Sequence, residues 1–180
     1  MLIKIENMTK IEKMRPTKEE YYLEIAKSVA QRSTCIRRKY GAVIVKNDAI
    51  ISTGYNGPAR GVINCFEVGC VKDLKNLPHG SAYEDCPGVH AEENAVVNAA
   101  RNGSNVLGGT LYIAGVDKEV KLVEAIPCSR CKRILINAGI EKVVIRKENG
   151  EIKYIHTQDW VSEDTKNYLE KLEKIKRKHD

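Results

Sequence analysis

Two short segments constrain this chain more than any other part of its sequence. The first, HAEENA, begins at His90 and carries a carboxylate two residues later, at Glu92; the second, PCSRC, contains Cys128 and Cys131. Together they offer one imidazole and two thiolates, a ligand set that binds zinc tetrahedrally and leaves the fourth position open. An open position is typical of catalytic zinc, whereas structural zinc is normally closed by four protein ligands. We therefore predict a metal site formed by His90, Cys128 and Cys131.

The chemistry of such a site gives Glu92 a separate role. Zinc lowers the pKa of a bound water toward about 7, so hydroxide is available at neutral pH. Because Glu92 lies too close to His90 in sequence to be assumed a ligand, we expect it to carry a proton from this water to a ring nitrogen and a leaving amine. H-x-E followed by P-C-x-x-C is the signature of zinc-dependent nucleobase deaminases. The competing interpretation, a buried structural histidine and a redox pair of cysteines, leaves the coincidence of these parts unexplained.

Length and composition indicate one globular domain. The chain has 180 residues, of which 42% are hydrophobic and 30% charged, and it lacks the run of roughly 20 apolar residues that spans a membrane. Residues 1–15 do not resemble a signal peptide. Six cysteines in such a chain favour a reducing, cytoplasmic location and metal binding. A net charge of +6 suits an anionic substrate, either a nucleotide phosphate or a nucleic acid.

The hydrophobic pattern predicts alternating helices and strands. Predicted helices cover about residues 17–32, 90–102, 129–138 and 162–177, and predicted strands cover 41–46, 49–53, 110–114, 142–146 and 151–156. Thr17 is the expected N-cap of the first helix and Ser162 the expected start of the last. Helix N-termini at the two motifs favour thiolates there. The pattern predicts an α/β sandwich with an antiparallel hairpin and parallel later strands. We expect a single domain over 1–180, with a core of about 17–146, an N-terminal arm at 1–15 and a C-terminal hairpin and helix at 147–180.

Two segments fit this scheme less simply. Residues 116–126 fit either a continuing strand or a hairpin arm. Residues 59–89 form a long connection without clear periodicity, which is unusual inside a compact domain. Such a connection needs something to hold it in place, and a second metal ion would do so.

Several motifs together give the chain a family resemblance. From Cys35 to Arg146 it resembles the deoxycytidylate (dCMP) deaminases of the cytidine deaminase-like superfamily. The histidine and cysteine motifs identify only the superfamily, whereas Asn94 together with the GYNG loop at 54–57 separates the nucleotide branch from the others. The motifs that carry the resemblance are STCIR at 33–37, YGAVIV at 40–45, GYNG, NC at 64–65, GC at 69–70, HAEENA and PCxxC.

The resemblance implies a fold and a reaction. The fold is a three-layer α/β/α sandwich with a mixed five-stranded central sheet. The reaction is zinc-dependent hydrolysis of dCMP to dUMP and ammonia, which supplies thymidylate synthesis. The family is also typically oligomeric, and dCTP and dTTP regulate some members. The segment 115–126 is longer here than the resemblance predicts, and we expect it to reshape a pocket wall or a subunit contact.

The resemblance also assigns substrate-binding residues. Asn56 resembles the asparagine that hydrogen-bonds the sugar, and Ala91 falls among the substrate-binding positions. Arg37 falls where a basic residue near the nucleotide is expected. Arg60 and Lys39 are weaker candidates for the phosphate, which arginine binds well through its planar donors. The alternative is that these basic residues are simply solvated on the surface.

Some family members carry a second, structural zinc, and the remaining cysteines suit one. Cys35 and Cys65 match positions used in the family, and His79 and Cys86 complete a set of four, with Cys70 as an alternative donor. The alternative is that these cysteines are small buried hydrophobic residues.

Other functions share parts of this pattern. The substrate alternatives are dCTP, CMP or a base in RNA or single-stranded DNA. Stacking of splayed bases needs aromatic side chains, and only 6% of the residues here are aromatic, which disfavours a nucleic acid. A more distant alternative is a non-catalytic zinc module that binds nucleic acid, for which neither Glu92 nor an open zinc position is needed.

Overall fold

The computed structural model describes residues 15–178, so nearly all of the expected N-terminal arm lies outside the described residues. Its centre is a mixed sheet whose strands follow the order β2-β1-β5-β7-β8, with the short β6 added to β5. The strands are β1 Arg38–Lys46, β2 Ala49–Tyr55, β5 Thr110–Asp117, β6 Leu122–Val123, β7 Lys142–Arg146 and β8 Ile152–His156. The predicted mixed sheet with a five-stranded path is confirmed.

The directions of the later strands differ from the prediction. β5 and β7 are parallel, but β8 returns antiparallel to β7 and β1 is antiparallel to β5. The prediction that the later strands are parallel therefore holds for β5 and β7 but was wrong for β8. The reason is local: β7 and β8 are joined by a short turn at Asn149–Gly150, and a short turn can connect only antiparallel neighbours.

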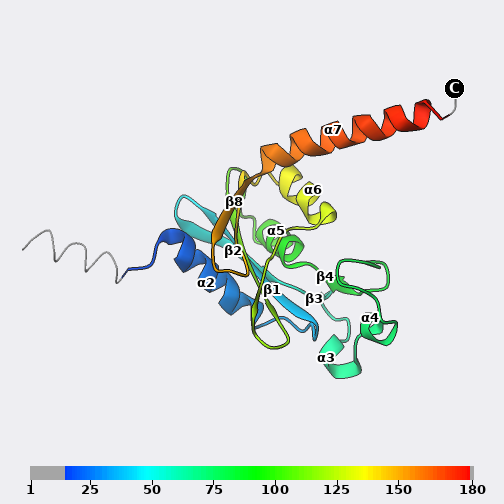
Figure 1. Cartoon of the computed structure of the whole chain (residues 1–180). Helices are drawn as coiled ribbons and strands as arrows, with labels where there is room; N and C mark the ends of the chain where they lie inside the picture. The colour runs from blue at the N-terminus through cyan, green and yellow to red at the C-terminus, as the bar shows by residue number, and fades with distance from the viewer. Residues whose placement is uncertain (1–14, 179–180) are drawn as a thin grey trace, which may run out of the picture.

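Helices cover both faces of the sheet, which confirms the predicted three layers (Figure 1). α2 packs against β1 and β5 on one face, while α5 packs against β2 and β1 on the other, next to α6. The long helices are α2 Lys18–Ala30, α5 Ala91–Arg101, α6 Ser129–Asn137 and α7 Thr157–Lys176. Within the described part of the chain, no helix is both long and apolar enough to cross a membrane.

A glycine sets how closely α5 approaches the sheet. A Cβ atom on Gly54 of β2 would collide with the backbone of Ala91 and Ala95 in the first turns of α5. The Ser52 hydroxyl also donates a hydrogen bond of 2.6 Å to the Ala95 carbonyl from the same strand. Because His90 directly precedes α5, this contact fixes the position of the first predicted metal ligand against the sheet.

The predicted start of the first helix and the predicted hairpin turn are confirmed. Thr17 caps α2, with its hydroxyl accepting from the Glu20 backbone and the Glu20 carboxylate accepting from the Thr17 backbone. Asn47 and Asp48 form the turn between β1 and β2 with φ of 51° and 61°, the left-handed conformation that a tight two-residue hairpin turn requires. The Tyr22 hydroxyl donates to the Asp48 carbonyl at 3.0 Å, which joins the turn to α2.

The last helix begins earlier than the sequence predicts. α7 starts at Thr157, directly after β8, and the predicted start at Ser162 was wrong. Trp160 is only 5% exposed and belongs to the main hydrophobic core. Because this residue packs in the core, the helix begins next to the sheet, before Trp160. The Thr157 hydroxyl also donates to the Ile140 carbonyl at 2.6 Å. Ser162 lies inside the helix, and its hydroxyl donates to the Gln158 carbonyl.

The two less regular segments now have defined paths. β5 continues to Asp117 and β6 returns antiparallel to it, so residues 116–126 contain a hairpin arm. The long connection contains two short helices and one short strand, which pairs with the segment after β2. These elements are β3 Gly57–Pro58, α3 Cys65–Val68, α4 Val71–Leu74 and β4 Gly88–Val89.

Candidate metal centre and active-site cavity

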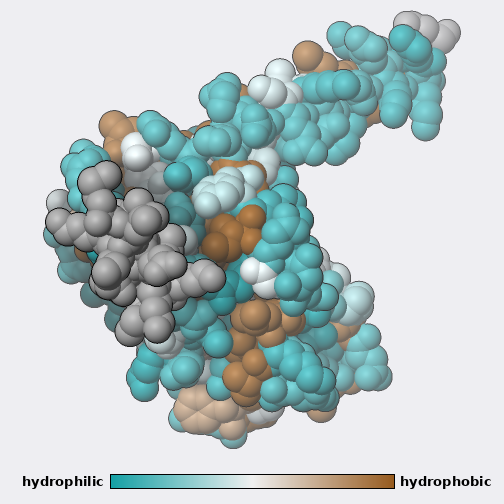
Figure 2. Space-filling view, turned by 60° about the vertical axis from the view of Figure 1, so that its left-hand side comes forward, coloured by the Kyte–Doolittle hydropathy of each residue, from teal (hydrophilic) through white to brown (hydrophobic). Residues whose placement is uncertain are grey.

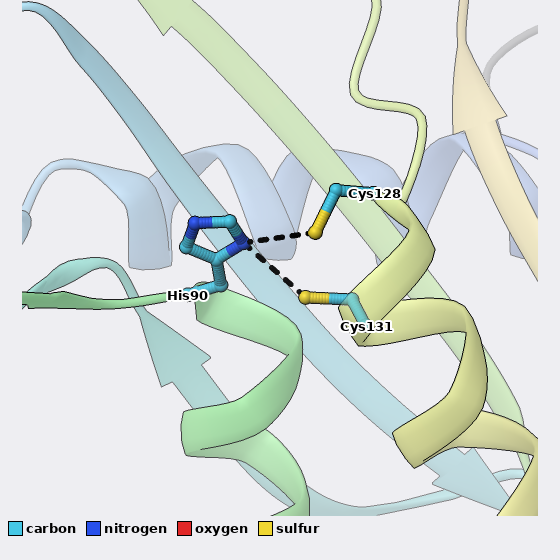
Figure 3. A group of neighbouring side chains, drawn as sticks. All are labelled: His90, Cys128 and Cys131. Carbon is cyan, nitrogen blue, oxygen red and sulfur yellow. Dashed lines mark hydrogen bonds between the residues drawn. The ribbon is translucent and has the colours of Figure 1, made fainter. Parts of the chain in front are cut away.

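The three predicted metal ligands converge between two helix N-termini (Figure 3). His90 is the N-cap of α5, and Cys128 and Cys131 lie at the N-cap and in the first turn of α6. The His90 Nδ1 atom lies 3.3 Å from Cys131 Sγ and 3.5 Å from Cys128 Sγ. In a tetrahedral zinc site with ordinary bond lengths, such nitrogen and sulfur ligands lie about 3.5 Å apart. The donor types and their spacing therefore fit a zinc ion with three protein ligands.

An acidic side chain joins the two helices that carry the ligands. Glu93 accepts a hydrogen bond of 3.1 Å from the His90 backbone N–H, which caps α5. The same carboxylate lies 2.6 Å from the Arg130 guanidinium in the first turn of α6. Glu93 is thus a bridge that holds the imidazole of His90 at a fixed position relative to the cysteine pair.

The protonation of the site suits a metal. A hydrogen bond from Cys131, together with one from His90, lowers the pKa of Cys128 to about 3. The hydrogen bond shared with Cys128, together with burial, raises the pKa of Cys131. Cys128 is thus the more readily deprotonated of the two cysteines, and its hydrogen bond to His90 also raises the pKa of His90. A metal ion would replace these protons as the partner of all three donors.

Glu92 lies beside the ligands without being one of the converging donors. It is 5% exposed, and burial raises the pKa of its carboxyl group. The Glu92 backbone N–H and the nearby His90 act in the opposite direction and favour the charged carboxylate, but burial outweighs them. A buried carboxyl group next to a metal site is well placed to accept and release a proton during a reaction there.

These groups open into one cavity of about 160 Å³. Its walls come from the start of β1, the segment after β2, the long connection, the start of α5 and the segment before α6. The lining residues include Cys35, Arg37, Arg38, Tyr40, Asn56, Cys65, Cys70, Lys72, His79, Tyr83, Cys86, His90, Ala91, Glu92, Ala125, Ile126 and Cys128. The segment 115–126 thus contributes Ala125 and Ile126 to the pocket wall.

Asn56 lines the cavity, but the protein already uses most of its amide group. Its Oδ1 atom accepts hydrogen bonds of 2.7 Å from the Ser33 hydroxyl and the Tyr40 backbone N–H. Its Nδ2 atom donates to the Arg38 carbonyl at 3.0 Å. An amide nitrogen carries two N–H donors, so one remains for a ligand. Asn56 can therefore donate to a ligand oxygen, but it has little remaining capacity to accept from a hydroxyl.

The basic residues predicted to contact phosphate lie in different places. Arg37 lines the cavity, where its Nε is 3.0 Å from Asp73 and its Nη2 donates to the Leu77 carbonyl. Arg60 lies outside this cavity and donates to the Asn98 side chain on α5 at 2.8 Å. Lys39 also lies outside the cavity lining. The structure therefore brings Arg37 to the site and leaves Arg60 and Lys39 away from it.

Sequence reasoning missed Lys72, a buried lysine that lines the same cavity. Lys72 is 7% exposed, its Nζ atom donates to the Ser81 carbonyl, and it lies 5.3 Å from the centre of the Tyr83 ring. Among residues 15–178, its side chain forms no salt bridge with a carboxylate. A second cation that sequence reasoning missed, Arg38, also lines the cavity. A buried cation is normally paired with an anion, which makes Lys72 a candidate to bind an anionic ligand in the cavity. The only signal in the sequence is a lysine in a segment without periodicity.

The residues proposed for a second zinc surround the same cavity. Cys35, Cys65, Cys70 and Cys86 all line it, and burial and the other three cysteines raise the pKa of Cys65. His79 lines the cavity too, but its ring lies next to Tyr40, 3.4 Å from the hydroxyl. Within the described residues, only His90, Cys128 and Cys131 bring three donor atoms within 4.8 Å of one another. The structure therefore does not gather the predicted set at ligand distance.

The part of the chain that holds these residues matches a known protein family. Residues 16–147 match the family described as the cytidine and deoxycytidylate deaminase zinc-binding region. The chain belongs to this family. The match covers nearly the same residues as the predicted core and contains both motifs that hold the candidate metal ligands. The predicted ligands His90, Cys128 and Cys131 thus all fall inside the zinc-binding region that the family description names.

Individual members of the family resemble the chain over most of its length. It is 35% identical over 134 residues to the deoxycytidylate deaminase of Schizosaccharomyces pombe, covering 73% of this chain and 38% of the yeast protein. It is 39% identical over 140 residues to the deoxycytidylate deaminase of Mycobacterium phage D29, covering 75% of this chain and 98% of the phage protein. The chain thus spans less than two fifths of the yeast relative but nearly the whole phage relative.

A solved structure agrees with the fold. The crystal structure of dCMP deaminase from the cyanophage S-TIM5, in complex with dCMP and dUMP, shares 28% sequence identity with this chain at a TM-score of 0.53. The superposition covers 72% of this chain and 80% of the cyanophage chain. The central sheet and its flanking helices thus resemble those of this deaminase.

Proposed function

We propose that this protein hydrolyses dCMP to dUMP and ammonia. The observation that carries the proposal is one cavity lined by two of the three candidate zinc ligands, His90 and Cys128, together with the buried Glu92 and the cationic side chains of Arg37, Arg38 and Lys72; the third ligand, Cys131, lies next to these two. The first two features suit deamination of a base, and the cations suit the phosphate of a nucleotide. The names of the yeast and phage relatives and the dCMP and dUMP bound in the cyanophage structure support this choice of substrate.

The residues around the metal site suit hydrolytic deamination. His90, Cys128 and Cys131 would hold zinc, which supplies the Lewis acidity that makes water nucleophilic at neutral pH. Glu92 accepts a proton from the attacking water and delivers protons to N3 of cytosine and to the leaving amino group. A C–O bond forms at C4 and the C–N bond breaks, so one water is consumed and one ammonia is released. The buried position of Glu92 keeps this proton transfer away from bulk solvent.

Residues farther from the metal ligands would select the nucleotide. The free N–H of Asn56 donates to an oxygen of the sugar, because its other hydrogen-bonding capacity is used inside the protein. Lys72 and Arg37 bind the phosphate. Lys72 is the stronger candidate of the two because Asp73 already offsets part of the charge of Arg37. Ala91, at the first position of α5, lies against the cavity, where a backbone N–H has no partner within the helix.

A substrate panel tests the proposal. Ammonia release is measured with purified full-length protein and dCMP, CMP, dCTP, deoxycytidine or a cytosine-containing oligonucleotide. The proposal predicts the highest kcat/KM for dCMP and a much lower value for deoxycytidine, which lacks the phosphate. A preference for dCTP or CMP would assign a different nucleotide, and activity on the oligonucleotide alone would assign a nucleic-acid base. No ammonia from any substrate would favour a binding module.

The biological setting is part of the same proposal. All six cysteines are free, which supports a reducing, cytoplasmic location. We also infer that the protein acts as a homo-oligomer and responds to dCTP or dTTP, as the family resemblance implies. The same ammonia assay with each triphosphate added tests the regulation. An unchanged dCMP saturation curve in the presence of either would contradict it.

We also infer a second, structural zinc in the long connection. The supporting observation is that Cys35, Cys65, Cys70 and Cys86 all line the same cavity. Because their sulfur atoms do not all lie within ligand distance, a metal would have to draw the side chains together. His79, which we predicted as a ligand from the sequence, is the less suitable donor, since its ring lies against Tyr40.

Metal analysis distinguishes this inference from the catalytic site. Two zinc ions per chain are expected, with one remaining after Cys65→Ser. The same loss is not expected from His79→Asn if the four cysteines form the site. One zinc per chain in fully active wild-type protein would remove the proposal.

A further inference from the structure

The last helix leaves the body of the protein after about its first two turns. α7 runs from Thr157 to Lys176, but only its beginning packs against other elements, through the buried Trp160 and a salt bridge of 3.8 Å between Glu163 and Lys132 of α6. Figure 1 shows the remainder projecting away from the sheet (red). An isolated helix of this length is marginal in water, and most helices in proteins depend on packing of an apolar face.

The projecting part of α7 has such an apolar face. Val161, Thr165, Tyr168, Leu172 and Ile175 follow one another at intervals of four, three, four and three residues. This spacing places all five on one side of the helix and is the a/d repeat of a coiled coil. Tyr168 is 64% exposed and Ile175 is 55% exposed. Figure 2 shows hydrophobic side chains interrupting the mostly hydrophilic surface of this arm.

The charges of α7 are separated along its length. The first half, residues 157–166, contains three acidic residues and one lysine, whereas residues 167–178 contain five basic and two acidic residues. A parallel pair of α7 helices would place like charges side by side. An antiparallel pair would place the acidic half of each helix against the basic half of the other, so the charge pattern complements itself in this orientation.

We propose that α7 pairs with α7 of a second copy of this chain as a short antiparallel coiled coil. The a/d face forms the seam, with Val161 of each helix near Leu172 of the other and Thr165 near Tyr168. Asp164 and Lys171 flank the seam at the same heptad position, and antiparallel pairing brings the two together across it. They are available for this contact, since the salt bridges that α7 makes within the described residues use Glu163 and Glu173 instead.

The two-fold symmetry of the pairing makes the contact self-complementary. Each Asp164 faces a Lys171 from the other copy, so one pair occurs twice. A single charge reversal therefore converts two attractions into two repulsions, and reversal of both residues restores both attractions. This property separates the antiparallel helix pair from any other way in which the chains associate.

Sedimentation velocity of the full-length protein over a concentration series tests the proposal. Asp164→Lys and Lys171→Asp are each expected to weaken self-association about tenfold, and the double variant is expected to return to the wild-type value. Lys174→Asp is the matched control because it makes the same charge change one turn away, outside the seam. All three positions are exposed on the helix, so the fold of the body is expected to persist.

Hydrogen exchange supplies a second measurement. The amides of residues 161–175 are expected to exchange more slowly as the protein concentration rises, and Lys171→Asp is expected to remove this dependence. The proposal is overturned if Lys171→Asp and Lys174→Asp behave alike, if the double variant does not recover, or if exchange in α7 is independent of concentration. Protection of α7 only by vesicles of anionic lipid, by nucleic acid or by another protein would assign a different partner.

Discussion

Replacement of Lys72 by methionine tests how the cavity recognises a nucleotide. Lys72 is 7% exposed, lines the cavity and forms no salt bridge with any carboxylate of residues 15–178. If its ammonium group binds the substrate phosphate, Lys72→Met removes a hydrogen bond to a charged group, which contributes about 1.5–3 kcal/mol. This corresponds to a decrease in kcat/KM for dCMP of roughly 10- to 150-fold. Methionine fills a similar volume, so the walls of the cavity remain close to their present positions.

The comparison with deoxycytidine decides the cause of the decrease. Steady-state ammonia release is measured for dCMP and deoxycytidine with wild-type protein, Lys72→Met and the control Lys75→Met. Lys75 lies one turn away in the sequence, and its exposed salt bridge with Asp85 contributes little to stability. We expect the decrease only for Lys72→Met and only with dCMP. Equal decreases with both substrates would show that Lys72 supports the loop through Ser81 instead, and unchanged kinetics would refute the phosphate contact.

The remaining predictions concern the proton carrier, the sugar contact and the packing of α5. Glu92→Gln is expected to keep the bound zinc and the circular dichroism spectrum but to lower kcat by about 10²–10⁴-fold, and near-normal turnover would contradict its role. Asn56→Asp places an oxygen against the Arg38 carbonyl and is expected to cost about 1–3 kcal/mol of unfolding free energy and to raise KM, as measured by urea denaturation and kinetics. Gly54→Ala forces a Cβ atom into the backbone of Ala91 and is expected to destabilise by about 1–3 kcal/mol, whereas unchanged stability would show that α5 moves freely.

The metal site was predictable because its information is local in the sequence. His90, Cys128 and Cys131 lie in two short motifs, and each motif begins a helix whose start is also visible in the sequence. The hairpin turn at Asn47–Asp48 was predictable for the same reason, since the conformation depends on two adjacent residues. Local chemistry thus accounts for the parts of the fold that position the ligands.

Features that depend on long-range packing were not predictable. The start of α7 depends on burial of Trp160 in the core, and the polar residues near Ser162 gave a misleading cap. The cavity position of Lys72 depends on the path of a connection with no periodicity. Arg60, which is close to Asn56 in the sequence, was a predicted candidate for the phosphate contact. Its side chain instead donates a hydrogen bond to Asn98, outside the cavity. In each case the position of the residue depends on contacts with parts of the chain that are distant in sequence, or on the path of a segment that has no regular hydrophobic pattern.

The central claim is that this protein replaces the amino group of dCMP with an oxygen from water. The most direct test is incubation of the zinc-loaded protein with dCMP in ¹⁸O-labelled water, followed by mass spectrometry of the nucleotide and measurement of ammonia. The account predicts dUMP carrying one ¹⁸O atom, with one ammonia released per dUMP, and loss of both products in Cys128→Ser. Unchanged dCMP with a fully occupied metal site, or dUMP without the label, would contradict it.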